Sequence, residues 1–273
     1  MNVKYDFGGR VALVTGAARG VGREIVHEFV AAGGAVLAVD RDPDGLAETC
    51  RDLGGLVRAA RGDIREESDC ERLVAAASQA FGRLDICVNN AAVAPHASLL
   101  EERVEVWDTV YAVNCRGTFL MTRAAAKAMI AQRRGGRIIN FSSGVSSRGS
   151  AGAAAYASSR AATESFTRVA AIELAPHNIL VNCVSPGLID TQPKPLPPEM
   201  ARSLSARIPN LPLARPGRPD EVASLVLWLS SDASSYVSGC TYCVDGASGV
   251  GSRSTAKVVD DDVRYDWVTG RRD

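Results

Sequence analysis

The stretch from Val11 to Ala32 constrains the fold of this chain more than any other. It begins as a short apolar run, which is typical of a strand buried on both faces of a sheet. Three glycines follow, and apolar residues then recur at the spacing of one helix face: Gly16, Gly20 and Gly22, then Val21, Ile25, Phe29 and Ala32. Such a unit can bind a phosphate, because glycines let the backbone approach it and a helix N-terminus offers free N–H groups. The same pattern also fits an ordinary strand–loop–helix without a ligand, so the rest of the sequence is needed to distinguish the two interpretations.

Apolar strand-like runs and helical patterns alternate along the remaining chain. Strands are expected at residues 11–15, 35–39, 56–60, 84–88, 137–141, 179–184 and 241–244. Helical patterns lie between them, the longest at 99–133 and 154–174. This alternation predicts an α/β fold: one doubly wound, Rossmann-type domain over residues 1–248, with a parallel sheet of about seven strands covered by helices on both faces. The proline-rich segment 188–218 is expected to form a lid or substrate loop, and residues 249–273 a C-terminal extension.

Composition excludes several classes of protein. Lysine plus arginine equals aspartate plus glutamate, at 31 each, which argues against nucleic acid as the main partner. No apolar run is long enough for a membrane span, and the first residues have no signal-peptide core, so we expect a cytoplasmic protein that binds no membrane. The seven cysteines are expected to be buried and reduced, with no metal site, because the Cys240 and Cys243 pair lies inside a strand pattern and has no second pair.

Polar residues or glycines follow nearly every expected strand, at the edge where ligands of such sheets bind. Asp40 follows the second strand, about twenty residues beyond the glycine turn, where a carboxylate can accept both ribose hydroxyls of an adenosine. The same charge would repel a 2′-phosphate, so we predict NAD rather than NADP. Arg41 and Arg19 could instead attract that phosphate, and Asp40 could merely cap the next turn.

Several of these residues together resemble the short-chain dehydrogenase/reductase family. They have its order and spacing: the glycine turn 15–22, Asn89-Asn90-Ala91-Ala92, Asn114, Ser143, Tyr156, Pro186-Gly187 and Thr191. The resemblance covers residues from about Phe7 to Gly246. It implies a nicotinamide-dependent oxidoreductase. By this resemblance, Tyr156 is the general acid or base on the substrate oxygen, Ser143 hydrogen-bonds the same oxygen, and Asn114 holds a water of a proton relay.

The resemblance also implies a cofactor site. Asp63 and Ile64 would contact the adenine, and Thr191 the nicotinamide carboxamide. With the residues already discussed, the expected cofactor-binding set is Gly16, Arg19, Gly20, Val21, Gly22, Asp40, Arg41, Asp63, Ile64, Asn90, Ala91, Ala92, Tyr156, Arg160, Pro186, Gly187, Ile189 and Thr191.

One position departs from the family pattern Tyr-x-x-x-Lys, since this chain reads Tyr156-Ala-Ser-Ser-Arg160. A spacing of four places Arg160 one helical turn from Tyr156 on the same face, where its charge can still lower the pKa of the phenol. An arginine does not give up its proton, so a relay that passes protons through an ammonium would be impaired. Ala92, where the family usually has glycine, is a lesser departure that could crowd the cofactor.

The substrate leaves a weaker signal. If the geometry of the family holds, His96, Val145, Arg148 and the segment 188–218 line the substrate pocket. Helices 99–133 and 154–174 resemble the family's dimer-forming pair, so a homo-oligomer, a dimer or a tetramer, is expected. The first hypothesis is an NAD-dependent oxidoreductase that interconverts a secondary alcohol and a ketone of a small molecule. The alternative is a cofactor-binding protein of the same fold with non-redox chemistry (an epimerase, dehydratase or cyclase) or without turnover, because Arg160 replaces the lysine.

Overall fold

The first strand, β1 (Val11–Thr15), is buried along its whole length and lies in the interior of the sheet, with strands paired to it on both sides. The structure, a computed structural model, describes residues 4–191, 198–251, 265–266 and 271–272. Part of the expected lid, 192–197, and most of the expected extension after residue 248, Trp267 included, lie outside the described residues.

The main sheet has seven parallel strands in the order β3-β2-β1-β4-β5-β6-β7. The other six strands are β2 (Ala35–Asp40), β3 (Val57–Arg61), β4 (Ile86–Asn89), β5 (Gly136–Phe141), β6 (Ile179–Pro186) and β7 (Thr241–Val244). The strand order turns back between β1 and β4, which pair directly through Leu13 and Cys87. This is the reversal point at which open parallel sheets bind ligands. The predicted doubly wound sheet is therefore confirmed.

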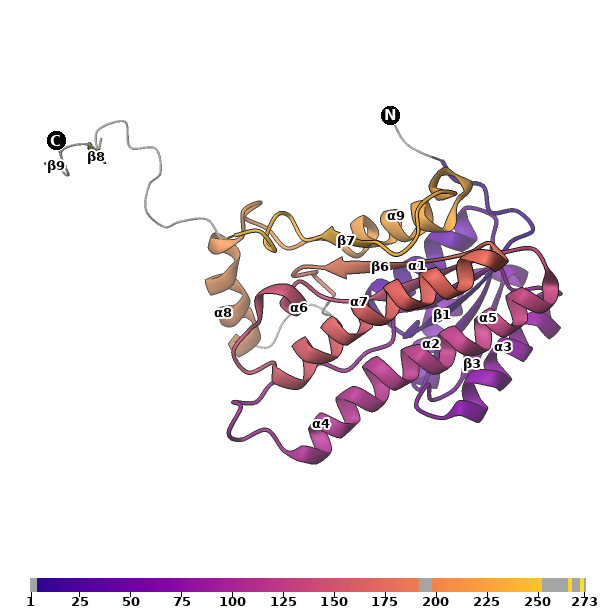
Figure 1. The fold of residues 1–273 in the computed structure, drawn as a ribbon, viewed down its shortest axis with the longest axis horizontal. Helices are drawn as coiled ribbons and strands as arrows, with labels where there is room; N and C mark the ends of the chain where they lie inside the picture. Colours follow the sequence, from indigo (N-terminus) through magenta and orange to yellow (C-terminus); the bar gives the residue numbers. More distant parts are fainter. Residues whose placement is uncertain (1–3, 192–197, 252–264, 267–270, 273) are drawn as a thin grey trace.

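Helices cover both faces of this sheet (Figure 1). Their bounds are α1 (Gly20–Ala31), α2 (Pro43–Cys50), α3 (Glu67–Phe81), α4 (Val104–Tyr111), α5 (Thr118–Gln132), α6 (Val145–Arg148), α7 (Ala154–Leu174), α8 (Pro198–Arg207) and α9 (Pro219–Ser230). Short 3-10 turns lie at Gly54–Leu56, Ala175–His177, Ile208–Asn210 and Asp232–Ser234. A small antiparallel pair joins β8 (Tyr265–Asp266) to β9 (Arg271–Arg272).

Two apolar cores follow from the alternation of side chains along the strands. Leu13 of β1 points to one face, where it packs with residues of α3, α5 and α7 such as Leu73 and Met121. Its neighbours in β1 point to the other face, which Phe29 of α1 and Val226 of α9 cover. Because both faces are covered, the central strands are apolar throughout, as the sequence indicates.

The predicted helix 99–133 is corrected in two respects. Helical structure begins only at Val104, and α4 and α5 are joined by a π-helical turn, Ala112–Gly117. The wider turn inserts an extra residue into the helical repeat without changing the apolar pattern around it, so the hydrophobic periodicity did not reveal it. Asn114 lies within this turn. Such π-turns are frequent at functional sites.

The expectation that all seven cysteines are buried is wrong for four of them. Cys50 and Cys115 are half-buried. Cys240 and Cys243 are exposed, because β7 is the edge strand of the sheet. All seven are free thiols, and burial raises the pKa of the Cys87 and Cys183 thiols to about 12.

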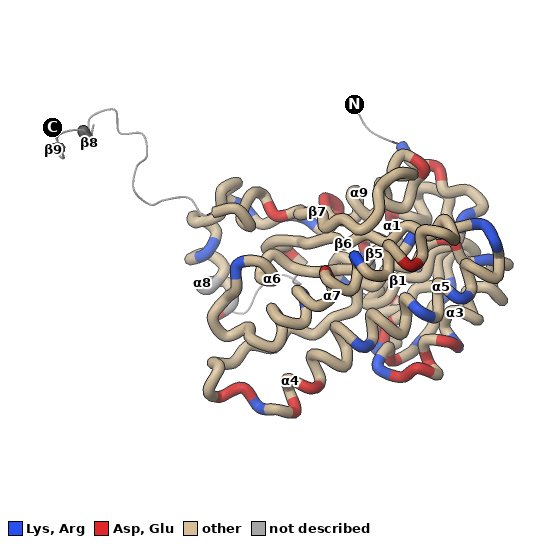
Figure 2. Tube along the Cα trace, in the orientation of Figure 1, with Lys and Arg blue, Asp and Glu red and all other residues tan. Residues whose placement is uncertain are grey.

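Charges of both signs are interspersed over the trace in Figure 2. Across the described residues, no group of three or more His, Cys, Asp or Glu side chains could hold a metal ion. No helix within this part of the chain is both long and apolar enough to cross a membrane.

Candidate cofactor and active site

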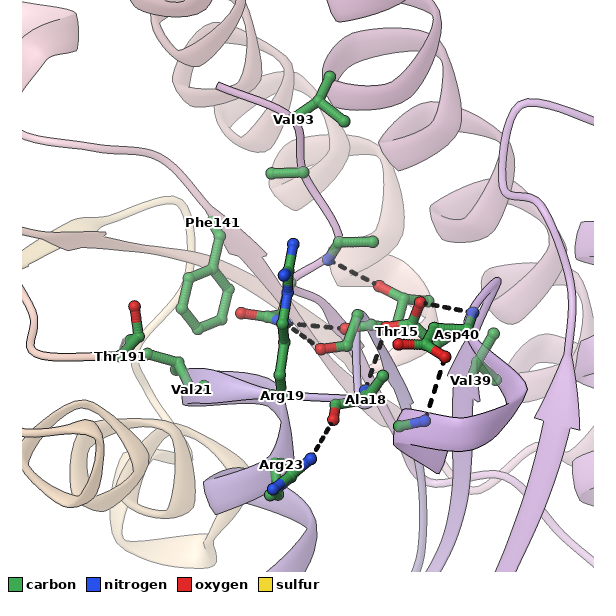
Figure 3. Close-up of a pocket in the computed structure, with 18 of the residues that line it drawn as sticks. Thr15, Ala18, Arg19, Val21, Arg23, Val39, Asp40, Val93, Phe141 and Thr191 are labelled. Carbon is green, nitrogen blue, oxygen red and sulfur yellow. Dashed lines mark hydrogen bonds between the residues drawn. The ribbon is translucent and has the colours of Figure 1, made fainter. Parts of the chain in front are cut away.

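A single cleft of about 1230 Å³ runs along the carboxyl ends of the strands (Figure 3). It extends from Asp40 and Asp63, beyond β2 and β3, to Tyr156 and Arg160 of α7. Most of the expected site residues line it: Gly16, Arg19, Gly20, Val21, Gly22, Asp40, Arg41, Asp63, Ile64, Asn90, Ala91, Ala92, Ser143, Tyr156, Arg160, Pro186, Gly187 and Thr191. Residues far apart in the sequence therefore meet at one edge of the sheet.

The turn between β1 and α1 leaves no room for a side chain at Gly16 or Gly22. Gly16 has a φ of 69°, and a Cβ atom there would lie 2.7 Å from Asn90 Nδ2. A Cβ atom on Gly22 would lie 2.1 Å from the Gly16 carbonyl oxygen. Asn90 Nδ2 in turn donates to the carbonyl oxygens of Thr15 and Gly16, at 3.0 and 3.1 Å. The end of β4 thus holds the turn in place and keeps its backbone open to the cleft.

Asp40 is fixed at the rim of the cleft by backbone N–H groups. Its Oδ2 accepts from the Ala18 amide at 3.0 Å, and its Oδ1 accepts from the amides of Arg41 and Asp42 at 2.7 and 3.1 Å. A carboxylate offers about four acceptor positions, so one remains on Oδ2. The capping role expected as an alternative is present, and it leaves acceptor capacity toward the cleft.

The arginines near Asp40 differ in their surroundings. Arg41 Nη1 lies 3.7 Å from Asp63 Oδ2, a contact between a mostly exposed guanidinium and a mostly buried carboxylate. Arg65 holds the same carboxylate more closely, at 2.6 Å, and its hydrogen bonds lower the pKa of Asp63. Arg19 is exposed, and in Figure 3 its side chain points from the glycine turn toward the side of the cleft where Val93 lies.

Tyr156 and Arg160 form a compact pair at the inner end of the cleft. The Arg160 guanidinium lies over the Tyr156 ring, with its central carbon 5.2 Å from the ring centroid. Arg160 is only 3% exposed, and its Nη1 donates to the Phe141 carbonyl oxygen at 2.8 Å. Burial raises the pKa of Tyr156, but the charge of Arg160 and hydrogen bonds from Arg160 and Ser143 outweigh it, so the pKa is lowered below 10.

Asn114 lies behind the wall of the cleft, unlike the other expected catalytic residues, which line it. It is fully buried and is not among the residues that line the cleft. Its Oδ1 accepts from the Val93 amide, and its Nδ2 donates to the Val93 carbonyl oxygen and to Ser159 Oγ, all at 3.0 Å. These contacts join the π-helical turn to the segment after β4 and to α7. Asn114 therefore positions the wall of the cleft beside Tyr156.

Four other expected residues lie away from the cleft lining. His96 and Arg148 are exposed, Val145 begins α6, and Ile189 pairs with Gly217 in an isolated β-bridge. Arg148 donates to the main-chain oxygen of Ser248 and so ties the end of α6 to the segment after β7.

The sequence analysis missed several residues of the site. Phe141, Val93 and Val113 line the cleft as apolar walls, but nothing distinguishes them in the sequence from core residues. Arg23 lies one turn into α1, where it pairs with both carboxylate oxygens of Glu48 at 3.0 Å and donates to the Ala18 carbonyl at 2.6 Å. Only the tertiary contact between α1 and α2 reveals that it braces the glycine turn.

The cleft suits a nicotinamide dinucleotide. Gly16 and Gly22 let the turn pack closely against its own backbone and Asn90 at the floor of the cleft, and Asp40 keeps an acceptor position at the ribose end. At the other end, the buried Nε of Arg160 has no hydrogen-bond partner among the residues that the structure describes. A buried N–H group without a partner is costly, so a bound polar group would stabilise this end of the site.

Comparison with known proteins agrees with this geometry. Residues 16–248 match the family described as enoyl-(acyl carrier protein) reductase. The chain is 38% identical over 241 residues to the 3-oxoacyl-[acyl-carrier-protein] reductase FabG of Thermotoga maritima, covering 87% of this chain and 97% of that protein. It is 33% identical over 252 residues to the sorbitol dehydrogenase of Cereibacter sphaeroides, covering 88% and 97%.

Solved structures give the same result. A short-chain type dehydrogenase/reductase from Mycobacterium marinum superposes with a TM-score of 0.82 at 34% identity, covering 89% of this chain and 97% of that one. The chain therefore belongs to the short-chain dehydrogenase/reductase family, whose members are oxidoreductases that bind a nicotinamide cofactor.

Proposed function

We propose that this protein is an NAD(H)-dependent oxidoreductase that interconverts a secondary alcohol and a ketone, with Tyr156 as the general acid and base. The observation that carries the proposal is the contact of Tyr156 with Arg160 and Ser143 at the inner end of the cleft, which lowers the pKa of the phenol. A general base works best when its pKa lies near the working pH, and an ordinary tyrosine is too weak a base at neutral pH.

The proton chemistry follows from these three side chains. In the oxidation direction, the Tyr156 phenolate takes the proton of the substrate hydroxyl, and in reduction the neutral phenol returns it. Ser143 donates a hydrogen bond to the same substrate oxygen and so orients the reacting carbon. A nicotinamide held in the cleft would supply the hydride acceptor for oxidation and the hydride donor for reduction. Arg160 stabilises the phenolate by its charge, and its free Nε is available to a ribose hydroxyl.

For the cofactor, we favour NAD over NADP on the placement of Asp40. Backbone amides hold its carboxylate at the tip of β2, where it would repel a 2′-phosphate. The charge of Arg41 is partly balanced by the nearby carboxylate of Asp63, so Arg41 would attract a 2′-phosphate less strongly. The names of the similar proteins include both a 3-oxoacyl reductase and a sugar-alcohol dehydrogenase, which share a hydroxyl–carbonyl interconversion, so they support the reaction class and leave the substrate open.

The first test is a parallel titration of the protein with NADH and NADPH, read by tryptophan fluorescence, followed by a screen of secondary alcohols and ketones. NADH binding at about micromolar level, roughly −8 kcal/mol, with NADPH much weaker, is expected. Tyr156→Phe should abolish turnover and leave NADH binding unchanged. Tighter binding of NADPH would refute the cofactor proposal, and turnover by Tyr156→Phe would refute the role of Tyr156.

The second candidate, non-redox chemistry on the same fold, rests on Arg160. A guanidinium holds the phenolate by charge but passes no proton, so the relay that includes Asn114 would stop there. Replacing Arg160 by lysine separates the two candidates. If Arg160→Lys raises the rate of alcohol oxidation, the protein is an oxidoreductase that an arginine slows. If no alcohol or ketone reacts in either variant while NADH binds, the non-redox candidate is favoured.

We also propose a homo-oligomer in the cytoplasm, with residues 1–248 as the catalytic domain and 249–273 as an extension. The exposed apolar side chains of Trp107 and Phe119 on α4 and α5, and of Val169 and Ile172 on α7, support an interface on these helices. Light scattering of the purified protein tests it, and a monomer at micromolar concentration would refute it.

A further inference from the structure

A half-buried cluster beside the active site has no part in the chemistry of Tyr156, Arg160 and Ser143. Glu164 lies on α7 one turn beyond Arg160 and two turns beyond Tyr156, so all three residues share a face of the helix. One oxygen of its carboxylate, Oε1, accepts from two serine hydroxyls: Ser142 Oγ at 2.5 Å and Ser146 Oγ at 2.6 Å. These distances are typical of a hydroxyl bonded to an ionised carboxylate, which is about twice as strong as a neutral hydrogen bond.

The two serines flank Ser143, which hydrogen-bonds Tyr156. Ser142 follows β5 directly, and its amide donates to the Val184 carbonyl of β6 at 2.8 Å. The chain then turns, and the Ser146 amide donates back to the Ser143 carbonyl at 2.9 Å. A single carboxylate oxygen thus holds both ends of the turn that carries Ser143. The same helix carries Tyr156, so Glu164 ties the two reacting hydroxyl groups to one rigid element.

Backbone contacts alone would not fix this turn as firmly. Ser142 is buried, and apart from Glu164 the one partner of its hydroxyl among the described residues is the Arg160 carbonyl oxygen, at a longer 3.3 Å. Beyond Ser146 the chain is exposed as far as Ser150. Without the carboxylate, the backbone amides of Ser142 and Gly144 still donate to the Val184 and Pro186 carbonyls of β6, at 2.8 and 3.2 Å, but the turn loses the acceptor that ties both of its ends to α7.

We propose that Glu164 is a positioning residue for catalysis, holding the Ser142–Ser146 turn so that Ser143 stays aligned with Tyr156. This inference rests on the proposed oxidoreductase function. Glu164 is not among the residues that line the cleft, and it reaches Ser143 through the two serines that it holds on either side. A displacement of about 1 Å in a reacting group lowers the rate about 10²-fold. We therefore expect loss of the Glu164 contacts with Ser142 and Ser146 to lower kcat more than it lowers the stability of the fold.

A double-mutant cycle tests this coupling. Ser143→Ala should lower kcat by about 10²-fold, and Glu164→Ala by about 10- to 100-fold, with the Kd for NADH unchanged in both. In the Ser143→Ala background, Glu164→Ala should change kcat by less than about 2-fold, because its only route of action is already gone. Glu164→Gln keeps an acceptor oxygen of the same shape and should recover most of the activity.

A control on the same helix separates positioning from loss of a surface charge. Glu173 is exposed near the end of α7, and Glu173→Ala should have the kcat of the unchanged protein. Thermal unfolding of each variant shows whether the fold is intact. The inference is wrong if Glu164→Ala has the same kcat as Glu173→Ala. It is also wrong if the fold-losses in kcat of Ser143→Ala and Glu164→Ala multiply in the double variant.

A second readout needs no turnover. The hydrogen bond from Ser143 lowers the pKa of Tyr156, beside the larger contribution of Arg160, which every variant retains. The ionisation of Tyr156 can be followed by tyrosinate absorbance, using Tyr156→Phe as the background. Its midpoint should rise in Glu164→Ala as much as in Ser143→Ala, and no further in the double variant. If the titration midpoint of Tyr156 does not move in Glu164→Ala, the inference is wrong, even if no substrate is found. This titration requires no turnover, so its result does not depend on whether the oxidoreductase proposal holds.

Discussion

Replacing Asp40 by alanine offers a quantitative test of how this site selects its cofactor. Three of the roughly four acceptor positions of the carboxylate are occupied by the amides of Ala18, Arg41 and Asp42. One position on Oδ2 is left for a ribose hydroxyl, rather than the two that the sequence analysis assumed. A hydrogen bond to a charged group contributes about 1.5–3 kcal/mol. We therefore expect Asp40→Ala to weaken NADH binding about 10- to 150-fold.

The same substitution should strengthen NADPH binding, because it removes the negative charge nearest the 2′-phosphate and leaves Arg41 and Arg19 in place. Fluorescence titrations of both cofactors, at one ionic strength, measure the two effects. Ala18 is buried and its amide loses its acceptor, so a loss of about 1–3 kcal/mol in stability is expected as well. Asp40→Asn, which keeps one acceptor oxygen, is the matched control. Equal weakening of NADH and NADPH would show that Asp40 only supports the glycine turn, and the argument for selectivity would be refuted.

Three further predictions concern the phenol, the glycine turn and the core. Arg160→Met removes the charge that lowers the pKa of Tyr156, so that pKa rises and the pH–rate profile of alcohol oxidation should move to higher pH; an unmoved profile would exclude Tyr156 as the base. Gly22→Ala places a Cβ atom 2.1 Å from the Gly16 carbonyl oxygen and should abolish NADH binding, with a lower melting temperature. Retained binding would show that the turn can rearrange. Leu73→Ala, at a fully buried position of α3, should cost about 2–5 kcal/mol in urea unfolding. A loss below 1 kcal/mol would contradict the packing described for this face.

The glycine turn, the alternation of strands and helices and the polar strand ends were readable from the sequence, because each is a local pattern. Gly16 and Gly22 mark a turn that no side chain could enter, and Asp40 follows its strand at the expected distance. The Tyr156–Arg160 contact follows from helical spacing alone, since residues four apart meet on one face. These features depend on a few neighbouring residues, and the sequence therefore determined the fold class and most of the cleft.

The tertiary structure alone decided which distant residues meet. The π-helical turn that buries Asn114 changes no hydrophobic spacing, and the exposure of Cys240 and Cys243 depends on β7 lying at the sheet edge. The pairing of Glu164 with Ser142 and Ser146 joins residues about twenty positions apart, and only the packing of α7 beside the loop after β5 brings them together. Local periodicity reports how a residue relates to its own helix or strand, whereas such contacts arise from how those elements pack against each other.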